Sequence, residues 1–200
     1  MALVDVLDAF ASNEPVPGGG SAAALAGALG VSLLVMVAGL PKTRTGAPEE
    51  AADLAEASAR LRPLRDSLLE LVDDDSRAYA AVLEAMRLPK ATAVERETRR
   101  AMIDAAMQGA TRVPLETMRF CQQALRGAVV VATHGTRNAS TDTGTAVELL
   151  AAALRSAGMN VDVNLQSVSD GAFAQRVSAE RAQLAADAET DAGSAREALQ

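Results

Sequence analysis

With 200 residues, the chain is long enough for one domain with a sizeable core. Its formal net charge of −7 argues against a nucleic-acid partner, and its single cysteine and single histidine exclude an internal disulfide and a thiolate zinc site. The sequence is rich in alanine and only 2% aromatic, which favours helices that pack closely through small side chains.

A short helix and a glycine turn open the chain. Apolar residues recur at helical spacing over residues 2–12, which predicts a helix. Two prolines and three glycines follow in Pro15-Val-Pro-Gly-Gly-Gly-Ser21, and Ser21 is a favourable N-cap for the next helix. Free N–H groups at such a helix N-terminus suit an anionic or carbonyl-bearing ligand. A plain tight turn is the alternative interpretation.

Residues 22–40 carry no charge and predict the central helix of the protein. A run of about 20 apolar residues is also long enough to cross a membrane. This run is rich in alanine and glycine and lacks Trp and Tyr anchors, and the segment before it is acidic with no basic residue. We therefore expect neither a membrane span nor a signal peptide, but a helix buried in a bundle or in an oligomer core.

Two long helices follow, and each contains a proline. A loop over residues 41–48 leads into a helix at 48–87, which Pro63 should kink or split. A capping box opens the next helix, at 92–133, in which Pro114 marks a bend.

The last part of the chain predicts two further helices after a polar loop at residues 133–142. The first of them runs to Ala157, with Gly158 as its C-terminal stop. Alternating apolar residues at 161–165 suit a strand, but no other segment offers a partner, so we interpret them as helix or as an irregular entry to the last helix. The last helix spans residues 170–189, and the end of the chain should fray.

The expected architecture is therefore an all-α bundle of long, kinked helices, in a single domain over residues 1–200. No internal repeat and no long linker divides the sequence. The lone cysteine suits a reducing, cytoplasmic compartment.

Several motifs, in this order along the chain, resemble those of the cyclodeaminase/cyclohydrolase family. This family comprises the C-terminal part of formiminotransferase-cyclodeaminase and free-standing methenyltetrahydrofolate cyclohydrolases. The motifs are Pro17-Gly-Gly-Gly-Ser21, Asp75-Ser-Arg-Ala-Tyr79, Ala110-Thr-Arg-Val-Pro-Leu115, Asn138-Ala-Ser-Thr-Asp142 and Asn160-Val-Asp-Val-Asn-Leu165. The resemblance covers nearly the whole chain and implies an all-helical homodimer that acts on a tetrahydrofolate derivative, with no metal or further cofactor.

The resemblance leaves two reactions open. A cyclohydrolase adds water to the methenyl carbon of 5,10-methenyltetrahydrofolate and opens the ring to 10-formyltetrahydrofolate. A cyclodeaminase closes the ring of 5-formiminotetrahydrofolate and expels ammonia. Both reactions need groups that remove and return protons at a carbon between two nitrogens. We predict the cyclohydrolase, because these residues include no transferase domain that would supply a formimino substrate. A cyclodeaminase and a non-catalytic folate-binding protein are the alternatives.

Two carboxylates are the catalytic candidates. Asp142 is the first choice because it lies in a polar loop ahead of a helix, although an N-cap role explains it equally well. Asp75 is the second: it follows Asp73 and Asp74 on a helix, so the three point in different directions and at least one should face inward. His134 is the only imidazole and could act as a base, but it lies outside the matched motifs.

The candidates for substrate binding offer hydrogen bonds or positive charge. They are Gly18, Gly19, Gly20, Ser21, Lys42, Arg44, Asn138 and Asn164. The glycine turn would present backbone N–H groups, the asparagines would pair with the edge of the pterin ring, and the basic residues would meet the glutamate carboxylates of folate. Turn hydrogen bonds and plain solvent exposure are the alternative interpretations of these polar residues.

Overall fold

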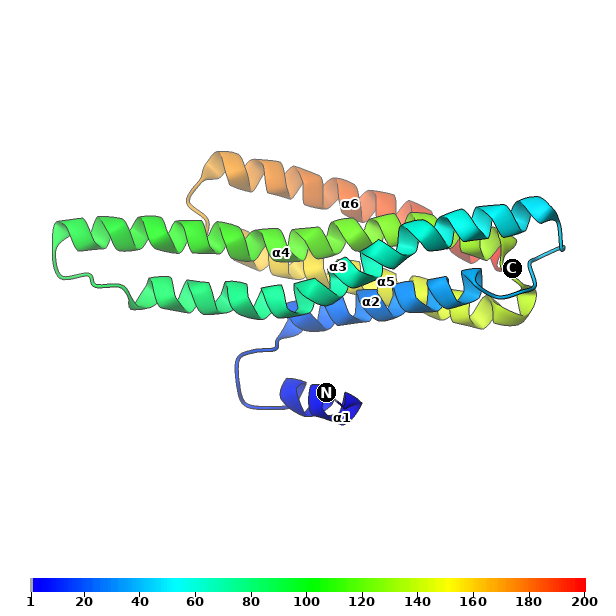
Figure 1. Cartoon of the computed structure of the whole chain (residues 1–200). Coiled ribbons are helices and arrows are strands. Elements are labelled where there is room, and N and C mark those ends of the chain that lie inside the picture. Colours follow the sequence, from blue (N-terminus) through cyan, green and yellow to red (C-terminus); the bar gives the residue numbers. More distant parts are fainter. Residues whose placement is uncertain (1) are drawn as a thin grey trace.

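The computed structural model describes residues 2–200 as a helical bundle (Figure 1). Its elements are α1 (Leu3–Phe10), α2 (Gly19–Ala38), α3 (Pro48–Arg87), α4 (Ala93–His134), the short 3-10 helix η1 (Arg137–Ala139), α5 (Ser140–Leu165) and α6 (Gly171–Ala198). Residues 2–200 contain no strand, and β pairing is confined to an isolated bridge between Thr43 and Gly135. The predicted all-α fold of long helices is confirmed.

Helix α2 is the centre of the bundle and packs against α3, α4 and α5. Its length and composition would allow it to cross a membrane, but most of it is buried inside the bundle, as in the core helix of a folded domain. Small residues permit the close packing: a Cβ at Gly27 would lie 2.8 Å from the sulfur of Cys121 on α4, and one at Gly30 would lie 3.0 Å from the Ala146 carbonyl on α5. The predicted central helix is thus confirmed.

Prolines lie inside the two longest helices without ending them. Helix α3 runs through Pro63 and changes direction along its length (Figure 1), and α4 runs through Pro114. The predicted capping box opens α4: the Thr92 hydroxyl accepts the Glu95 N–H at 3.1 Å, and the Glu95 carboxylate accepts the Thr92 N–H at 2.8 Å. The bond from the Thr92 N–H is the main cause of the lowered pKa of Glu95.

The predicted stop of α5 at Gly158 is wrong. The helix continues to Leu165, so the alternating residues 161–165 are helical. Gly158 is buried against α6, where a Cβ would lie 3.4 Å from the guanidinium of Arg181. Glycine serves here for close packing between helices rather than for termination.

The predicted end of α6 near residue 189 is also wrong, because the helix continues to Ala198. Ala192 and Ala195 are completely buried in the core. The local sequence of this segment predicts fraying, but packing against the bundle keeps it helical. Tertiary contacts here override local helix propensity.

Helix α1 stands apart from the bundle (Figure 1), and none of its residues is buried. Leu3 and Leu7 are 74% and 58% exposed. A loop from Ala11 to Gly18 joins α1 to α2. The short predicted helix is confirmed, and it forms an arm outside the core.

Candidate functional site

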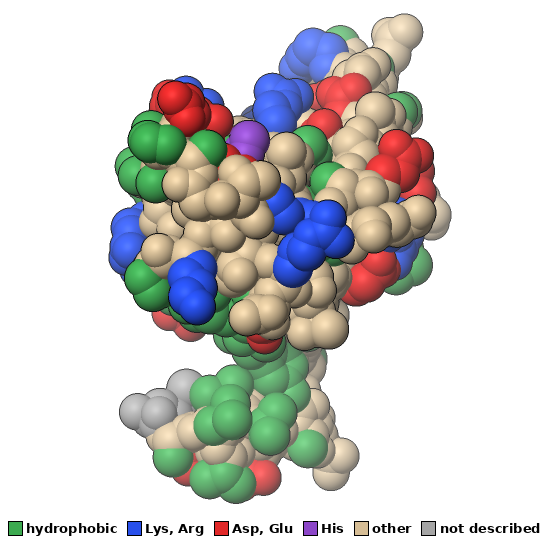
Figure 2. Space-filling view, turned by 90° about the vertical axis from the view of Figure 1, so that its right-hand side faces the viewer, with side chains coloured by type: hydrophobic (Ala, Val, Ile, Leu, Met, Phe, Trp, Pro, Cys, Tyr) green, Lys and Arg blue, Asp and Glu red, His purple; other side chains and the backbone are tan. Residues whose placement is uncertain are grey.

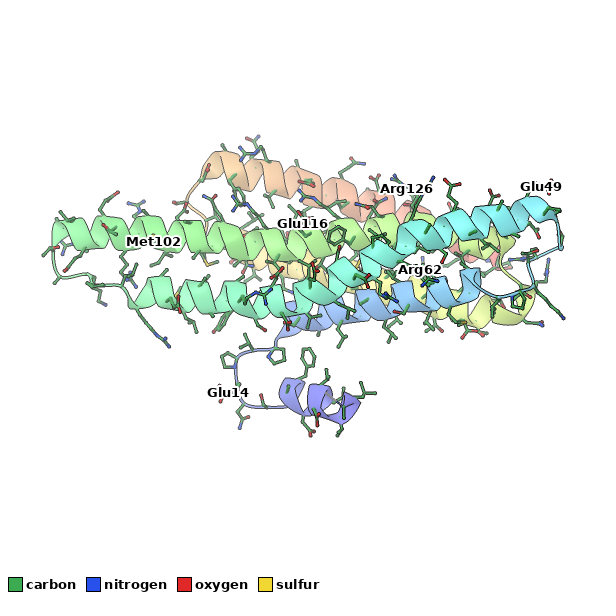
Figure 3. The ribbon with its side chains drawn as sticks, in the orientation of Figure 1. Glu14, Glu49, Arg62, Met102, Glu116 and Arg126 are labelled. Atoms are coloured by element: carbon green, nitrogen blue, oxygen red, sulfur yellow. The ribbon has the colours of Figure 1, made fainter. Side chains whose placement is uncertain are left out.

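The glycine turn borders a cavity of about 270 Å³, close to the lower end of small-molecule pockets. The cavity lies where the first turn of α2 meets α3, α4 and α5. Its lining residues are Pro15, Val16, Gly18, Gly19, Gly20, Asp75, Ala78, Tyr79, Val82, Met107, Ala110, Asn160 and Asn164. The loop that carries Glu14 in Figure 3 supplies one wall.

Asp75 connects α3 to the first turn of α2. Its Oδ2 accepts the Ser21 backbone N–H at 2.9 Å and the Ser21 hydroxyl at 3.0 Å. The N-terminus of α2 is therefore capped by a carboxylate from another helix, where the unpaired N–H groups and the helix dipole favour negative charge. Oδ1 of Asp75 accepts no hydrogen bond from residues 2–200, and Asp75 lines the cavity.

The predicted role of Ser21 as an N-cap is wrong. Helix α2 begins at Gly19 with Gly18 as its N-cap, which places Ser21 in the first turn. The Ser21 hydroxyl is fully buried and lies 2.8 Å from the Val72 carbonyl oxygen as well as near Asp75. Ser21 therefore fixes Asp75 and joins α2 to α3, and it does not line the cavity.

Asn164 reaches the cavity through a break in the hydrogen bonds of α4. Because Pro114 has no N–H, the carbonyl of Ala110 lacks its partner four residues on. The Nδ2 of Asn164 donates to that carbonyl at 2.9 Å. Its Oδ1 is left as a hydrogen-bond acceptor on a residue that lines the cavity.

Asn160 is a second asparagine on the cavity wall that sequence analysis did not assign to the site. Its Nδ2 donates to the Ser156 carbonyl at 3.0 Å, so its Oδ1 is also left as an acceptor. The signal was present in the sequence, since Asn160 and Asn164 are four residues apart and share one helix face. Tyr79, Val82 and Met107, which supply apolar lining, were not assigned either.

The other predicted site residues lie at the opposite end of the bundle. Asp142 is in the first turn of α5, and the 18 residues from there to Asn160 correspond to about 27 Å along the helix. Within one chain the structure does not bring Asp142 to Asp75. Helix α5 begins at Ser140 with Ala139 as its N-cap, so Asp142 is not the N-cap residue either.

Arg44, Lys42 and Asn138 also lie at that end. The guanidinium of Arg44 donates to the carbonyls of Gly135 and Ala198 at 3.2 and 3.3 Å, and to that of Ala132. Arg44 thus ties the loop after α2 to the ends of α4 and α6. Lys42 and Asn138 are exposed.

A glutamate holds the same loop in place. Glu50 on α3 accepts hydrogen bonds from the Thr43 hydroxyl at 2.6 Å and from the Thr45 N–H at 2.9 Å. These bonds, with that of Thr43 the largest cause, lower the pKa of Glu50 to about 2.

His134 borders a different groove, of about 670 Å³, between α3 and α4. Its Nε2 lies 3.4 Å from a carboxylate oxygen of Asp53, and Arg60 in the same groove pairs with Glu56. Apart from His134, none of the candidate catalytic or substrate-binding residues lines this groove. Residues 2–200 hold no cluster of three His, Cys, Asp or Glu side chains that could bind a metal ion.

The smaller cavity has the groups that acid–base chemistry on a polar heterocycle requires. Asp75 has one oxygen anchored and one free, which suits it to accept a proton or to stabilise a nearby positive charge. The amide oxygens of Asn160 and Asn164 can accept hydrogen bonds from ring N–H groups. The cavity unites the glycine turn, Asp75 and Asn164, and it is our candidate site.

Comparisons with known proteins agree on one family. The family described as formiminotransferase-cyclodeaminase matches residues 2–183. The chain is 41% identical, over 169 residues, to a methenyltetrahydrofolate cyclohydrolase of Methylorubrum extorquens, and the match covers 84% of this chain and 81% of that protein. It is 31% identical, over 165 residues, to the formimidoyltransferase-cyclodeaminase of Gallus gallus, of which it covers 30%.

A solved structure shares the fold. The crystal structure of formiminotetrahydrofolate cyclodeaminase from Thermotoga maritima matches with a TM-score of 0.88, covering 100% of this chain and 96% of that one. At 24% identity, this similarity shows a shared fold. With the family match over most of its length, the chain belongs to the formiminotransferase-cyclodeaminase family.

Proposed function

We propose that this protein hydrolyses 5,10-methenyltetrahydrofolate to 10-formyltetrahydrofolate, with Asp75 as the acid–base group. The observation that carries the proposal is the half-anchored carboxylate: Ser21 holds Oδ2 of Asp75, while Oδ1 remains available at a cavity edged by two asparagines. The identity of 41% to a protein named methenyltetrahydrofolate cyclohydrolase favours this reaction.

The substrate explains why a carboxylate suits the site. The methenyl carbon lies between two nitrogens that share a positive charge, so a nearby carboxylate stabilises the bound cation. Asp75 then takes a proton from the attacking water, and a tetrahedral carbon with a hydroxyl group forms. Returning that proton to the N5 nitrogen breaks the C–N5 bond, the hydroxyl proton passes to solvent water as the C=O bond forms, and the formyl group stays on N10. A single acid–base group of this kind contributes about 10²–10⁴-fold to the rate.

The other cavity residues would orient the substrate. The asparagine oxygens would accept hydrogen bonds from the donors on the pterin ring, and Tyr79, Val82 and Met107 would cover its faces. We propose that no metal or cofactor takes part, because proton transfer and charge stabilisation are sufficient for this step.

We also propose that the protein is a cytoplasmic homodimer. Cys121 is unpaired and buried, which suits a reducing compartment. The exposed apolar side chains on α1 and α2, such as Leu7 and Leu29, favour association with a second chain.

Absorbance in the near ultraviolet tests the reaction directly, because the methenyl substrate absorbs there and its product does not. We expect the purified protein to accelerate the decay far above the uncatalysed rate. Release of ammonia from 5-formiminotetrahydrofolate, without that decay, would instead support the cyclodeaminase. Tight binding without acceleration of either reaction would support a folate-binding protein.

A further inference from the structure

The wall of the cavity that carries Asn164 lies beyond the part of α5 that is buried in the core. Val161 is the last buried residue of α5, and the turn after it is exposed or partly buried, with Val163 62% exposed. The ion pair between Asp162 and Arg181, at 2.8 Å, links this turn to α6. The position of Asn164 against α4 therefore depends on hydrogen bonds more than on apolar packing.

A carboxylate on α4 holds the chain just after this turn. Oδ1 of Asp104 accepts the Ser169 N–H at 2.5 Å and the Ser169 hydroxyl at 2.6 Å. Ser169 belongs to the α5–α6 connection, residues 166–170, which passes beside α4 (Figure 1). The hydroxyl and the N–H of Ser169 lower the pKa of Asp104, since both favour the charged carboxylate. Charge-assisted hydrogen bonds thus tie the connection to α4.

The same face of α4 supports Asp104 and holds the start of α6. Gln108, one turn on, donates its side-chain amide to Oδ2 of Asp104 at 2.9 Å. Arg112, a further turn on, donates to the side-chain oxygen of Gln108 at 3.3 Å and lies 5.1 Å from the centre of the Phe173 ring. Phe173 is buried in the first turn of α6. Asp104, Gln108 and Arg112 therefore form one polar row at helical spacing.

Two contacts with α4 bracket the segment that carries Asn164. At its start, the Asn164 amide donates to the Ala110 carbonyl, and at its end, Ser169 donates to Asp104. The two α4 residues are six positions apart, which corresponds to about 9 Å along the helix. A single hydrogen bond would let the segment pivot about it, whereas two separated contacts fix its direction.

We propose that Asp104 is a positioning residue for substrate binding: it holds the α5–α6 connection against α4 and so keeps Asn164 at the wall of the candidate cavity. Asp104 is not among the residues that line the cavity, so it acts through Ser169 and the last turn of α5 rather than by touching the ligand. That the ligand is a folate rests on the proposed function, whereas the link between Asp104 and Asn164 does not.

Deuterium exchange tests this link without any assay of activity. Asp104→Ala should accelerate exchange of the amides over residues 162–169 several-fold, while the amides of α2, on the opposite wall, keep their wild-type rates. Ser169→Ala removes the hydroxyl and keeps the N–H, so its effect should be smaller. The double variant should exchange no faster than Asp104→Ala alone, because both changes break one contact. Unchanged exchange over residues 162–169 in Asp104→Ala would overturn the proposal.

Kinetics with the methenyl substrate test the effect on binding. Asp104→Ala should raise KM about tenfold, the scale of one lost hydrogen bond, and change kcat less than twofold, because Asp75 and Ser21 on the other wall are untouched. Asp104→Asn, whose amide oxygen can still accept from Ser169, should bring KM back to within about threefold of wild type. A lowered Tm with an unchanged KM would assign Asp104 a purely structural role and overturn the positioning role.

Two other aspartates are the matched controls. Asp187 accepts the side-chain amide of Gln183 at 2.8 Å, as Asp104 accepts a glutamine amide, but both partners lie within α6. Asp53 lies 3.4 Å from the single histidine, at the end of the bundle that faces the viewer in Figure 2. Asp187→Ala and Asp53→Ala should keep the wild-type KM. A failure of the proposed function would show in the wild-type protein, which would not hydrolyse the methenyl substrate, and the exchange experiment would still decide on Asp104.

Discussion

Gly20 and Asp75 approach each other across the α2–α3 interface so closely that a side chain at position 20 would displace the carboxylate. A Cβ on Gly20 would lie 2.6 Å from the Cγ and 2.8 Å from the Oδ2 of Asp75. Gly20 is thus required for the approach of Asp75 rather than for an unusual backbone angle, because Gly46 is the only described residue with a positive φ.

Gly20→Ala should therefore reduce activity more than it reduces stability. The added methyl group must push Asp75 away from Ser21, and the carboxylate can move because it ends a side chain. We expect kcat to fall at least tenfold and the free energy of unfolding to fall by about 1–3 kcal/mol, the usual cost of overpacking. Steady-state kinetics and thermal melting measure both effects. Gly193→Ala on α6, where a Cβ meets nothing within 4 Å, is the control.

Asp75→Asn should lower kcat about 100-fold or more while the helix content stays unchanged, because the amide can still accept from Ser21 but cannot take a proton. Asp74→Asn, one position along α3 in an exposed pair with Arg77, should keep wild-type turnover. Asp142→Asn is the decisive comparison. A larger loss for Asp142→Asn than for Asp75→Asn would return the catalytic role to Asp142, the first choice from the sequence.

Pro114→Ala should weaken substrate binding without weakening the helix. Alanine supplies the N–H that Ala110 lacks, so this N–H competes with Asn164 for the same carbonyl. We expect KM to rise several-fold as Asn164 loses its fixed orientation. Pro63→Ala in α3, far from the cavity, should leave KM unchanged. An unchanged KM in Pro114→Ala would show that the Asn164 amide does not orient the substrate.

The loop after α2 should lose stability in acid through Glu50. Its folded pKa of about 2 lies below the ordinary glutamate pKa of 4.5, so hydrogen bonding to the carboxylate stabilises the fold above about pH 4.5. That contribution is lost as the pH falls from there towards 2. Because other carboxylates titrate in the same range, the measurement is the difference in Tm between wild type and Glu50→Gln. The difference should be constant above pH 5 and shrink below it.

The sequence predicted the elements well and their contacts poorly. Helical periodicity and the capping box at Thr92 are local signals, and both proved reliable. The stop at Gly158 failed because the same residue type serves both for helix ends and for close packing against Arg181. Local sequence gives no means of telling the two apart.

The candidate site shows the same limit. Pro114 predicted a bend in α4. Only the fold shows that the Ala110 carbonyl, which Pro114 leaves without a partner, accepts a hydrogen bond from Asn164. Asp75 was a candidate among three consecutive acids, and only the position of α2 shows that Asp75 is the one held by Ser21. Asp142 matched a motif equally well, yet α5 carries it to the other end of the bundle.

The central position of α2 also sets the order in which the backbone opens to solvent. Most of its residues from Ala23 to Val37 are buried against three helices, so their amides exchange with deuterium mainly when those helices separate. The connection between α3 and α4 near Pro89 is exposed and contacts little else, so its neighbouring turns can fray alone. Deuterium uptake should therefore spread inward from that tip, and protection should last longest in the one helix that carries no ionisable side chain.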